Sequence, residues 1–462
     1  MHTSLTLAFI ASAAATWAAP SPLAPSSDAD WPPAPHACWL DITMDEYAAQ
    51  LIAVLATDHR LPDFKYITDE GSLISKSSGV RVSLANTYAA FMELPLGERP
   101  ASIRRVAAGI ARMRDDDPLL EEVRGMLLPK VWSHSGLGML AAERFGLGAT
   151  STDVAVTVPG WRLGEHMAAF LAINYPDSVQ AVTPELLLRW GVPKEVLCNE
   201  AEERLASLRL SWEAMSIEGE DGPLILLPEF PEDETYFASQ LLLVAKDERL
   251  GVQDGARAAL PSKDTLLVYI DTSAGLNEIF IGEIERASSG PYPLSPVPLV
   301  LKDGVWKDWT VPSDDPQRHR YRNAFREFQS SLYAGQASVL RGLQDSLVAN
   351  DGDRAAAPPA IPKDRIPAEY IATYELYREE GEAELFSRTI WAENVDYLLP
   401  RVDRLALLPE GGGPEDVVAV KWSQVEELAK ELLVPVPGTV PPLYRTRGFP
   451  GKQVLKRLTK PN

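Results

Sequence analysis

The feature that most constrains the fold is the irregular order in which helix-like and strand-like apolar patterns follow each other. In the stretch 99–113, apolar residues recur at the spacing of one face of an amphipathic helix: Ile103, Val106, Ala107, Ile110 and Met113. The runs 80–84 and 265–271 are short and apolar, which is typical of strands. Because the two patterns do not alternate regularly, the sequence predicts an α+β fold with a mixed sheet and packed helices rather than a doubly wound parallel sheet.

Shifts in composition divide the chain into successive parts. Proline and charge replace the apolar pattern near 311–320, and the stretch 350–367 has the composition of a linker or long loop. The C-terminal extension is expected to be α+β or helical. We expect a leader over 1–19, a Pro- and Ala-rich linker over 20–38, a large α+β domain over 39–312, a helix and linker over 313–367, a small α+β module over 368–449 and a basic tail over 450–462.

Local signals place two elements more closely. Thr183 precedes Pro184, and this pair predicts the start of a helix because the hydroxyl can cap free N–H groups and proline loses nothing at the first helical position. Three glycines at 411–413 lie between the apolar runs 402–410 and 416–422, which predicts a β-hairpin.

The composition is that of a globular protein with a strong excess of acid. Of 462 residues, 45% are hydrophobic and 24% are charged, which excludes a wholly disordered or collagen-like chain. The 44 Lys and Arg are outnumbered by 65 Asp and Glu, and the formal net charge is −21. Such a charge repels a phosphate backbone, so we expect no nucleic acid partner.

The N-terminus allows two interpretations of the protein's location. An apolar run of signal-peptide length ends with the small residues Thr16, Ala18 and Ala19, but it lacks Lys and Arg before it. The protein is therefore expected to be exported or secretory, with a cytoplasmic protein carrying an uncleaved leader as the alternative. The run is shorter than the about 20 apolar residues of a membrane span, and no later segment reaches that length, so we expect no transmembrane segment.

Between about 58 and 310 the chain resembles a known family. The segments that carry the resemblance are DFKYITDEGSLISKSSGVRVSLANTYAAF, WGVPKEVLCNEAEERLASL, DETYFASQLLL and ALPSKDTLLVYIDTSAG, in that order and at matching spacing. They resemble the YtpQ-like family of bacterial proteins, whose members generally look cytosolic. The resemblance implies a domain type and no particular activity or catalytic residue. The leader and the C-terminal extension are additions to the family pattern.

Carboxylates near the end of one expected strand are the candidates for a metal site. Asp271 ends the apolar run 265–271, and the acidic cluster of Glu229, Asp233 and Glu234 follows an earlier strand-like run. Carboxylates at strand ends can converge on a hard cation such as Mg²⁺ or Ca²⁺, which takes several oxygen ligands. The alternative is a solvated acidic face, which a chain of this charge shows in any case, and Asp233 can also cap a following helix.

His134 is the candidate general base, because a histidine in a loop after the strand-like run 127–132 can accept a proton. The GLGMLA segment that follows imitates a dinucleotide-binding pattern, although the required second parallel strand is poorly supplied. Loop glycines that accommodate positive φ are the alternative. The neighbours Glu165 and His166 form a poor metal-binding pair, since adjacent residues on a helix point away from each other.

Two further features have simple explanations. Cys38 and Cys198 form no zinc-binding spacing, and Cys198 lies on an expected helix, where a lone cysteine is more often a small core residue than a nucleophile. The C-terminal stretch 444–462 carries six basic residues and no acid, so it is expected to dock on the acidic body of its own chain or on an anionic partner: Arg445, Arg447, Lys452, Lys456, Arg457 and Lys460.

The sequence contains no recognisable catalytic constellation. The leading hypothesis is therefore a binding or accessory module that contacts a protein or a small ligand without catalysis. The competing hypothesis is a carboxylate- and metal-dependent hydrolase or transferase centred on Asp271, with a divalent cation as its cofactor.

Overall fold

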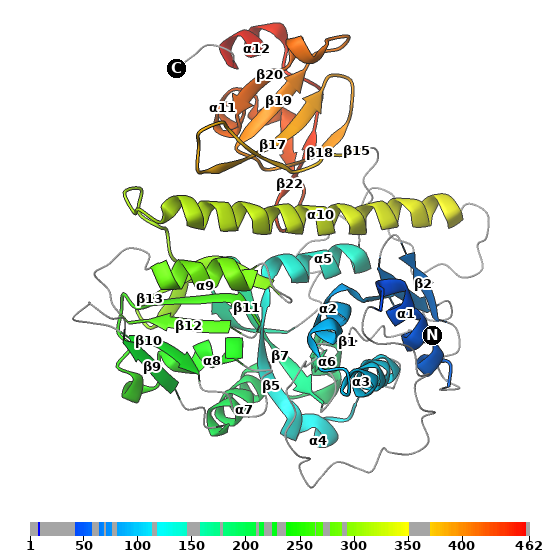
Figure 1. The fold of residues 1–462 in the computed structure, drawn as a ribbon, viewed down its shortest axis with the longest axis vertical. Coiled ribbons are helices and arrows are strands. Elements are labelled where there is room, and N and C mark those ends of the chain that lie inside the picture. The colour runs from blue at the N-terminus through cyan, green and yellow to red at the C-terminus, as the bar shows by residue number, and fades with distance from the viewer. Residues whose placement is uncertain are drawn as a thin grey trace.

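The computed structural model confirms the predicted α+β class, with helices packed on sheets that are largely antiparallel (Figure 1). The structure describes residues 8–9, 42–57, 64–68, 71–75, 81–112, 118–145, 158–175, 179–208, 212–216, 224–228, 237–263, 265–270, 278–288, 293–350 and 370–458.

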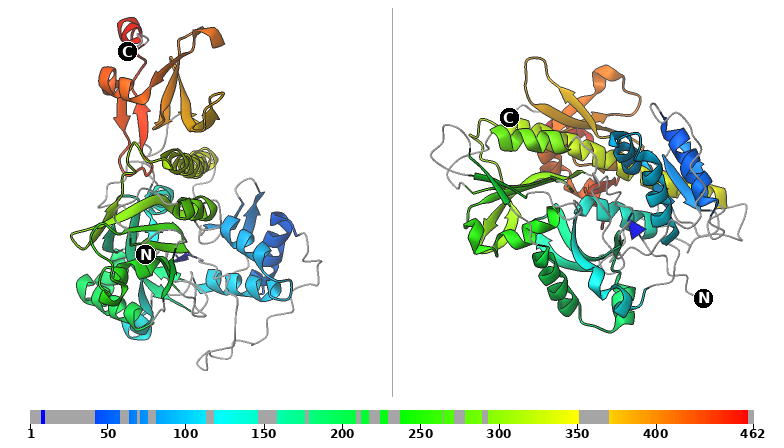
Figure 2. Two further views of the ribbon diagram at one scale, coloured as in Figure 1. Left: turned by 60° about the vertical axis from the view of Figure 1, so that its left-hand side comes forward. Right: turned by 60° about the horizontal axis from the view of Figure 1, so that its bottom comes forward.

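Three layers follow each other along the long axis of the molecule. The described elements up to residue 312 form a body, and one long helix, α10 (Arg318–Asn350), crosses above it. Residues 370–458 form a C-terminal module on the other side of α10, as Figures 1 and 2 both show. The long helix is therefore the element shared by the body and the module.

Helices α1 to α3 and a small sheet form a unit at one side of the body (Figure 2). Thr43 and Glu46 form a capping box at the start of the first helix, because each side chain accepts a hydrogen bond from the other residue's backbone N–H. Tyr47, Leu51 and Ile103 are fully buried between the helices. The elements are α1 (Met44–Leu55), β2 (Phe64–Ile67), β3 (Ser72–Ser75), β4 (Arg81–Ser83), α2 (Ala85–Glu93) and α3 (Arg99–Arg112).

An antiparallel sheet forms the centre of the body. Its strands run in the order β1, β8, β7 and β5, and β6 also pairs with β7. Thr183 accepts a hydrogen bond from Leu186 N at the start of the helix beginning at Pro184, so the predicted cap is confirmed. The elements are β1 (Ala8–Phe9), α4 (Leu120–Val123), β5 (Leu127–Ser133), α5 (His134–Phe145), β6 (Pro159–Leu163), β7 (Met167–Asn174), β8 (Val179–Ala181), α6 (Pro184–Trp190) and α7 (Lys194–Ser207).

A second antiparallel sheet, in the order β14, β13, β11, β12, β10 and β9, is covered by a helix on each face. Neighbouring residues Leu266 and Leu267 point to opposite faces, and they join the cores under α8 and α9 respectively. The elements are β9 (Trp212–Ser216), β10 (Leu224–Pro228), α8 (Phe237–Val244), β11 (Arg257–Ser262), β12 (Thr265–Tyr269), α9 (Glu278–Ser288), β13 (Pro293–Lys302) and β14 (Val305–Asp308).

Two four-stranded sheets and two short helices build the C-terminal module. One sheet has the order β15, β18, β22 and β21, and the other has the order β16, β17, β19 and β20. The predicted hairpin around 411–413 is confirmed as the antiparallel pair of β19 and β20. The elements are β15 (Tyr370–Ile371), β16 (Glu375–Arg378), β17 (Leu385–Ala392), β18 (Tyr397–Pro400), β19 (Arg404–Leu408), β20 (Val418–Lys421), α11 (Trp422–Leu428), β21 (Leu433–Pro435), β22 (Leu443–Thr446) and α12 (Lys452–Leu458).

Side chains on one stripe of α10 join the core of the module. Tyr333 and Leu340 are buried there with Trp391, and the Tyr333 hydroxyl donates to Pro442 O at 2.9 Å. A buried ion pair adds to this contact. Arg326 of α10, whose side chain is 5% exposed, reaches Asp403 of the module at 2.8 Å. The module is thus anchored on α10 by both packing and charge.

The structure corrects two local predictions and excludes one alternative. His134 and the glycines after it lie in helix α5 rather than in a loop, and Gly136 fits against the Trp132 indole, where an added Cβ would lie 2.2 Å from Nε1. The dinucleotide pattern is excluded geometrically, because β5 pairs with β7 in the antiparallel direction. Glu165 and His166 occupy the turn between β6 and β7 and not a helix.

Candidate functional site

Two histidines meet a carboxylate where the two large sheets of the body approach each other under α10. His134 is the first residue of α5, Glu165 and His166 lie in the turn between β6 and β7, and Asp308 is the last residue of β14. We call these four residues the histidine site. Glu165 and Asp308, which are 143 positions apart in the chain, come together here.

Backbone hydrogen bonds hold the turn of the histidine site in place. Gly164 has a positive φ of 66°, which is favourable for glycine, and its N–H donates to Trp306 O at 3.2 Å. The next N–H, of Glu165, donates to Asp308 Oδ2 at 3.0 Å. On the other side, His134 N donates to His166 O at 2.9 Å. The turn is therefore bound to both sheets through its main chain.

The two imidazoles have different partners. His134 Nδ1 lies 2.6 Å from Glu165 O, and since a carbonyl oxygen only accepts, this contact assigns the proton to Nδ1 and leaves Nε2 as the acceptor of the neutral ring. His166 Nε2 lies 3.9 Å from Asp308 Oδ2, beyond hydrogen-bond distance. The His166 ring packs edge-on against Phe325 of α10, with 5.7 Å between ring centroids.

Burial governs the ionisation of the histidine site. It lowers the pKa of His166, and the carboxylates of Asp308 and Glu165 oppose this shift only in part. Burial also raises the pKa of Asp308, against the hydrogen bond from Glu165 N. On α10, burial together with the Asp308 charge raises the pKa of Tyr321 to about 12. The contact with α10 therefore favours the neutral forms of these groups.

One atom of the site lacks a partner. Asp308 Oδ1 is buried and makes no hydrogen bond to any described residue. Its position depends on Gly164, because a Cβ added at Gly164 would lie 1.9 Å from this oxygen. The carboxylate is therefore placed by close approach to a glycine and by the bond from Glu165 N.

A second feature lies on the outward side of one sheet in the C-terminal module. Alternate residues of a strand point to opposite faces. In β17, Thr389 and Trp391 are buried in the core, whereas Arg388 and Ile390 point outward and are exposed. The cross-strand partners in β16 and β19 follow the same alternation. We name the outward set the Arg–aromatic face: Tyr377, Phe386, Arg388, Ile390 and Arg404.

Arginines and aromatic rings alternate along this face. The guanidinium carbon of Arg404 lies 5.0 Å from the ring centroid of Phe386 and 5.9 Å from that of Tyr377. Toward the edge strand β16, the guanidinium carbon of Arg388 lies 5.4 Å from the ring centroid of Tyr377. The buried Arg326 of α10 continues the series, 5.5 Å from the Phe386 centroid. These distances are those of cation–π contacts.

The exposed end of the face is apolar. Ile390 is 47% exposed, and its neighbour across β19 is Ala406, followed by Ala419 of β20. The two arginines are paired with acids, since Arg388 Nε lies 2.9 Å from Glu375 Oε2 and Arg404 binds Glu379. The face thus combines planar side chains, an exposed isoleucine and balanced charge.

Comparisons with protein-family models, curated proteins and solved structures found no match for this chain.

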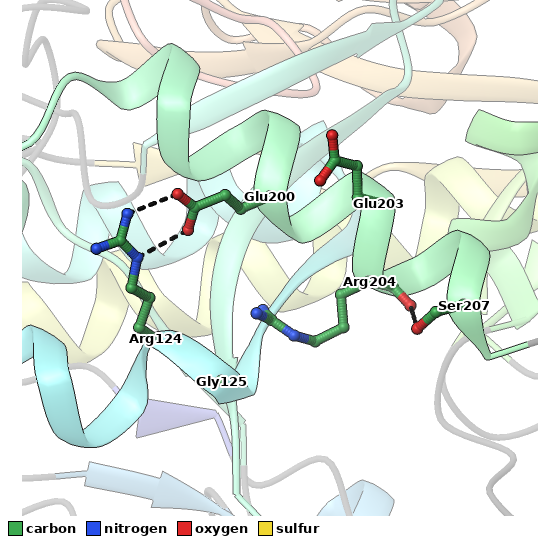
Figure 3. Close-up of a pocket in the computed structure, with 6 residues that line it drawn as sticks. All are labelled: Arg124, Gly125, Glu200, Glu203, Arg204 and Ser207. Carbon is green, nitrogen blue, oxygen red and sulfur yellow. Dashed lines mark hydrogen bonds and ion pairs between the residues drawn. The ribbon is translucent and has the colours of Figure 1, made fainter.

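A surface hollow of about 520 Å³ lies on the body between α7 and the turn before β5 (Figure 3). Arg124 spans this hollow and binds Glu200 through two bonds, of 2.9 and 2.6 Å. Arg204 donates to Leu127 O at 2.8 Å. These bonds occupy the arginines that line the hollow, and Figure 3 shows Glu203 pointing away from them. The hollow therefore offers a ligand few free groups.

Of the catalytic and metal-site residues predicted from sequence, only His134 lies in the described part of the chain. Asp271, Glu229, Asp233 and Glu234 lie outside the described residues, and the divalent-cation site built from them stays a prediction. Within the described ranges, His, Cys, Asp and Glu side chains nowhere gather in threes that would hold a metal ion.

Cys198 and the tail have the surroundings of structural elements. Cys198 is buried on α7 with a free thiol, and burial raises the pKa of that thiol, as expected for a core residue. In the tail, α12 packs into the core of the module through apolar side chains, and Leu458 is 2% exposed. Binding of its basic residues to an anionic partner stays a prediction, and Lys460 lies outside the described residues.

Sequence reasoning missed His166 as a partner of His134, and it missed Asp308 and Tyr321 altogether. A glycine followed by Glu165 and His166 is a turn signal that was available. Asp308 ends a short strand and carries no local signal of its own. Asp308 belongs to the site only because two sheets meet there, and no local sequence pattern predicts that meeting.

Proposed function

We propose that this chain is a binding or accessory protein without catalysis, and that it recognises a partner protein through the Arg–aromatic face. The single observation that carries the proposal is the composition of an open sheet face. Aromatic residues and arginine are enriched in the centres of protein–protein interfaces, where planar side chains give large contact area.

The fold of the module does not require these side chains to be aromatic or apolar. The inner face of the same sheet already supplies the core, with Trp391, Leu405 and Leu407 fully buried. An outward isoleucine with about half of its surface in water gains stability only when a further surface covers it. A partner that covers Ile390 would gain this burial.

The net charge of the chain indicates which class of partner binds the Arg–aromatic face. A sheet with stacked aromatic and arginine side chains can also bind single-stranded nucleic acid. Here the net charge is −21, and both arginines of the face are paired with glutamates. A protein surface with mixed polarity fits this arrangement better than a polyanion does.

For the body we retain the YtpQ-like resemblance over about 58–310 as a proposal for its domain type, which carries no activity. Export by way of the leader, with a cytoplasmic location as the alternative, also stays a prediction. None of the helices in the described ranges has the length and apolar character needed to cross a bilayer. The metal-dependent reaction centred on Asp271 has no specific observation in its favour.

A photo-crosslinking amino acid at position 390 tests the proposal in cells that produce the protein. We expect one defined adduct from Ile390, because a bound partner lies within reach of this side chain. Leu188 on α6, which is 83% exposed, is the matched control position and should not give the same adduct. Mass spectrometry then identifies the partner.

The purified partner permits a quantitative measurement. We expect Arg404→Ala to weaken its binding by at least about tenfold in calorimetry, as for an interface residue that contributes more than about 1 kcal/mol. Arg286→Ala, which removes an exposed and paired arginine on α9, should leave the affinity unchanged. Equal adducts from positions 188 and 390, or an affinity insensitive to Arg404→Ala, would contradict the proposal.

A further inference from the structure

Helix α10 has two sets of contacts at its N-terminal half. Toward the module, Asn323 accepts a hydrogen bond from Leu385 N and Arg326 binds Asp403. Toward the body, Tyr321 packs into the core with α9, and Phe325 contacts the His166 ring. Residues four apart share a helix face, so Tyr321 and Phe325 together cover the histidine site.

Among the described residues, the titratable groups that face His166 come from β14, α5, α10 and its own turn. Asp308 approaches from β14, Glu165 from the same turn and His134 from α5, and each influences the ionisation of His166. Two residues of α10 face His166. They are Tyr321, whose pKa is raised by burial and by the Asp308 charge, and the uncharged Phe325. The nearby Arg320 of α10 is bound instead to Glu285 of α9, at 2.5 Å. No described basic side chain of α10 is paired with the histidine site.

We infer that the histidine site is a proton-controlled contact, at which protonation of His166 loosens the N-terminal half of α10 from the body and so frees the C-terminal module to move. The histidine side chain is 34% exposed, so protons reach it while α10 is still packed on the body, an arrangement that we call the seated state. The Phe325 ring contact, in contrast, offers the charged form no hydrogen-bond acceptor.

The sign of the effect follows from linkage. When α10 is seated, burial holds the pKa of His166 below its ordinary value of 6.5. When α10 is released, the ring is hydrated and the pKa returns toward 6.5. Protons therefore bind more strongly to the released state, and acid favours release. The contribution of His166 to the stability of the seated state is therefore fully present above pH 6.5. It is lost as the pH falls from 6.5 through the lower pKa that His166 has in the seated state.

Asp308 opposes this effect at lower pH. Its pKa is raised above 3.8 in the seated state, so the seated state gains protons there and acid stabilises it. The ordinary pKa of histidine lies inside the range from pH 7.5 to 5.0, whereas the ordinary pKa of Asp308, 3.8, lies below it. Asp308 also attracts a protonated His166, so its removal should increase the effect of acid.

Hydrogen–deuterium exchange of the full chain tests the inference. We expect protection of the α10 segment 318–337 to fall by about tenfold between pH 7.5 and pH 5.0, after correction for intrinsic exchange and relative to α7. In His166→Gln, which cannot be protonated, this fall should disappear.

Two further variants complete the experiment. His319→Gln is the matched control, since His319 lies on the same helix, exposed, with Nδ1 3.1 Å from Pro316 O, and it should keep the fall. Asp308→Asn should make the fall larger. A purely structural role predicts instead that His166→Gln lowers protection equally at both pH values, and this result would overturn the inference.

A measurement on the unmodified protein does not depend on how the variants fold. Nuclear magnetic resonance titration of the ring protons should give His166 a pKa below the ordinary histidine value of 6.5. A His166 pKa at or above 6.5 would show that the seated helix does not disfavour the proton, and the inference would be wrong.

Discussion

Arg326→Ala should release the C-terminal module from α10 at a cost of about 3–5 kcal/mol, the range found when one partner of a buried ion pair is removed. Arg326 is 5% exposed and binds Asp403 through two bonds, at 2.8 and 2.9 Å, and Glu384 at 2.7 Å. Alanine removes the cation that binds Asp403, whereas Glu384 keeps its ion pair with Arg322 at 2.8 Å. Asp403 then remains partly buried as an uncompensated charge.

The ionisation of Asp403 supports this expectation. Although burial acts to raise its pKa, the hydrogen bonds from Arg326 and from Ser387 hold the pKa of Asp403 below 3.8. A carboxylate with a depressed pKa stabilises the folded protein above pH 3.8, and this stabilisation is lost as the pH falls through the lower value. Near neutral pH the pair is therefore fully charged and contributes completely.

Exchange of the β17 and β19 amides with deuterium reports the free energy of opening of the module. Arg388→Ala is the matched control, because Arg388 lies on the same sheet but is 54% exposed and has one glutamate partner, so its removal should cost less than about 1 kcal/mol. Equal protection in the two variants would show that the Arg326–Asp403 pair does not anchor the module on α10.

The elements that the sequence predicts well are those with local signals. The helix α3 follows from apolar spacing, the start of α6 from Thr183 before Pro184, and the pair β19–β20 from three glycines between apolar runs. Each of these signals acts within about ten residues. Short-range hydrogen bonding and periodicity therefore suffice to place these elements.

Two local predictions failed for reasons that are themselves physical. Helix α5 contains glycines that favour loops, yet Gly136 is needed there because Trp132 occupies the space of a side chain. From sequence, Glu165 and His166 are expected on a helix, but the tertiary pairing of β6 with β7 makes their segment a turn. In both cases a contact from another element outweighs local propensity.

The candidate sites differ in how much of each could be predicted from the sequence. His134 could be named because histidine is chemically versatile at neutral pH, but its neighbours depend on the meeting of two sheets. The Arg–aromatic face needed the register of β16, β17 and β19, since only that register places Tyr377, Phe386 and Arg404 side by side. A shift of one residue would turn these side chains into the core.

Gly164→Ala should destabilise the body by about 3 kcal/mol, combining backbone strain of about 1–2 kcal/mol with a steric conflict of similar size. The glycine has a φ of 66°, and an added Cβ would lie 1.9 Å from Asp308 Oδ1 and 3.0 Å from Leu299 Cδ2. The carboxylate cannot retreat without losing the bond from Glu165 N. The loss should appear in chemical denaturation of the full chain.

Gly191→Ala separates the two contributions. Gly191 ends α6 with nearly the same φ of 65°, but an added Cβ there meets no atom within 4 Å. It should therefore show the strain alone, about 1–2 kcal/mol. If the two variants are equally stable, Asp308 is not held against the turn. If Gly164→Ala is the less stable, the close approach of carboxylate and glycine positions Asp308 beside His166. The proton-controlled contact between α10 and the body requires this arrangement.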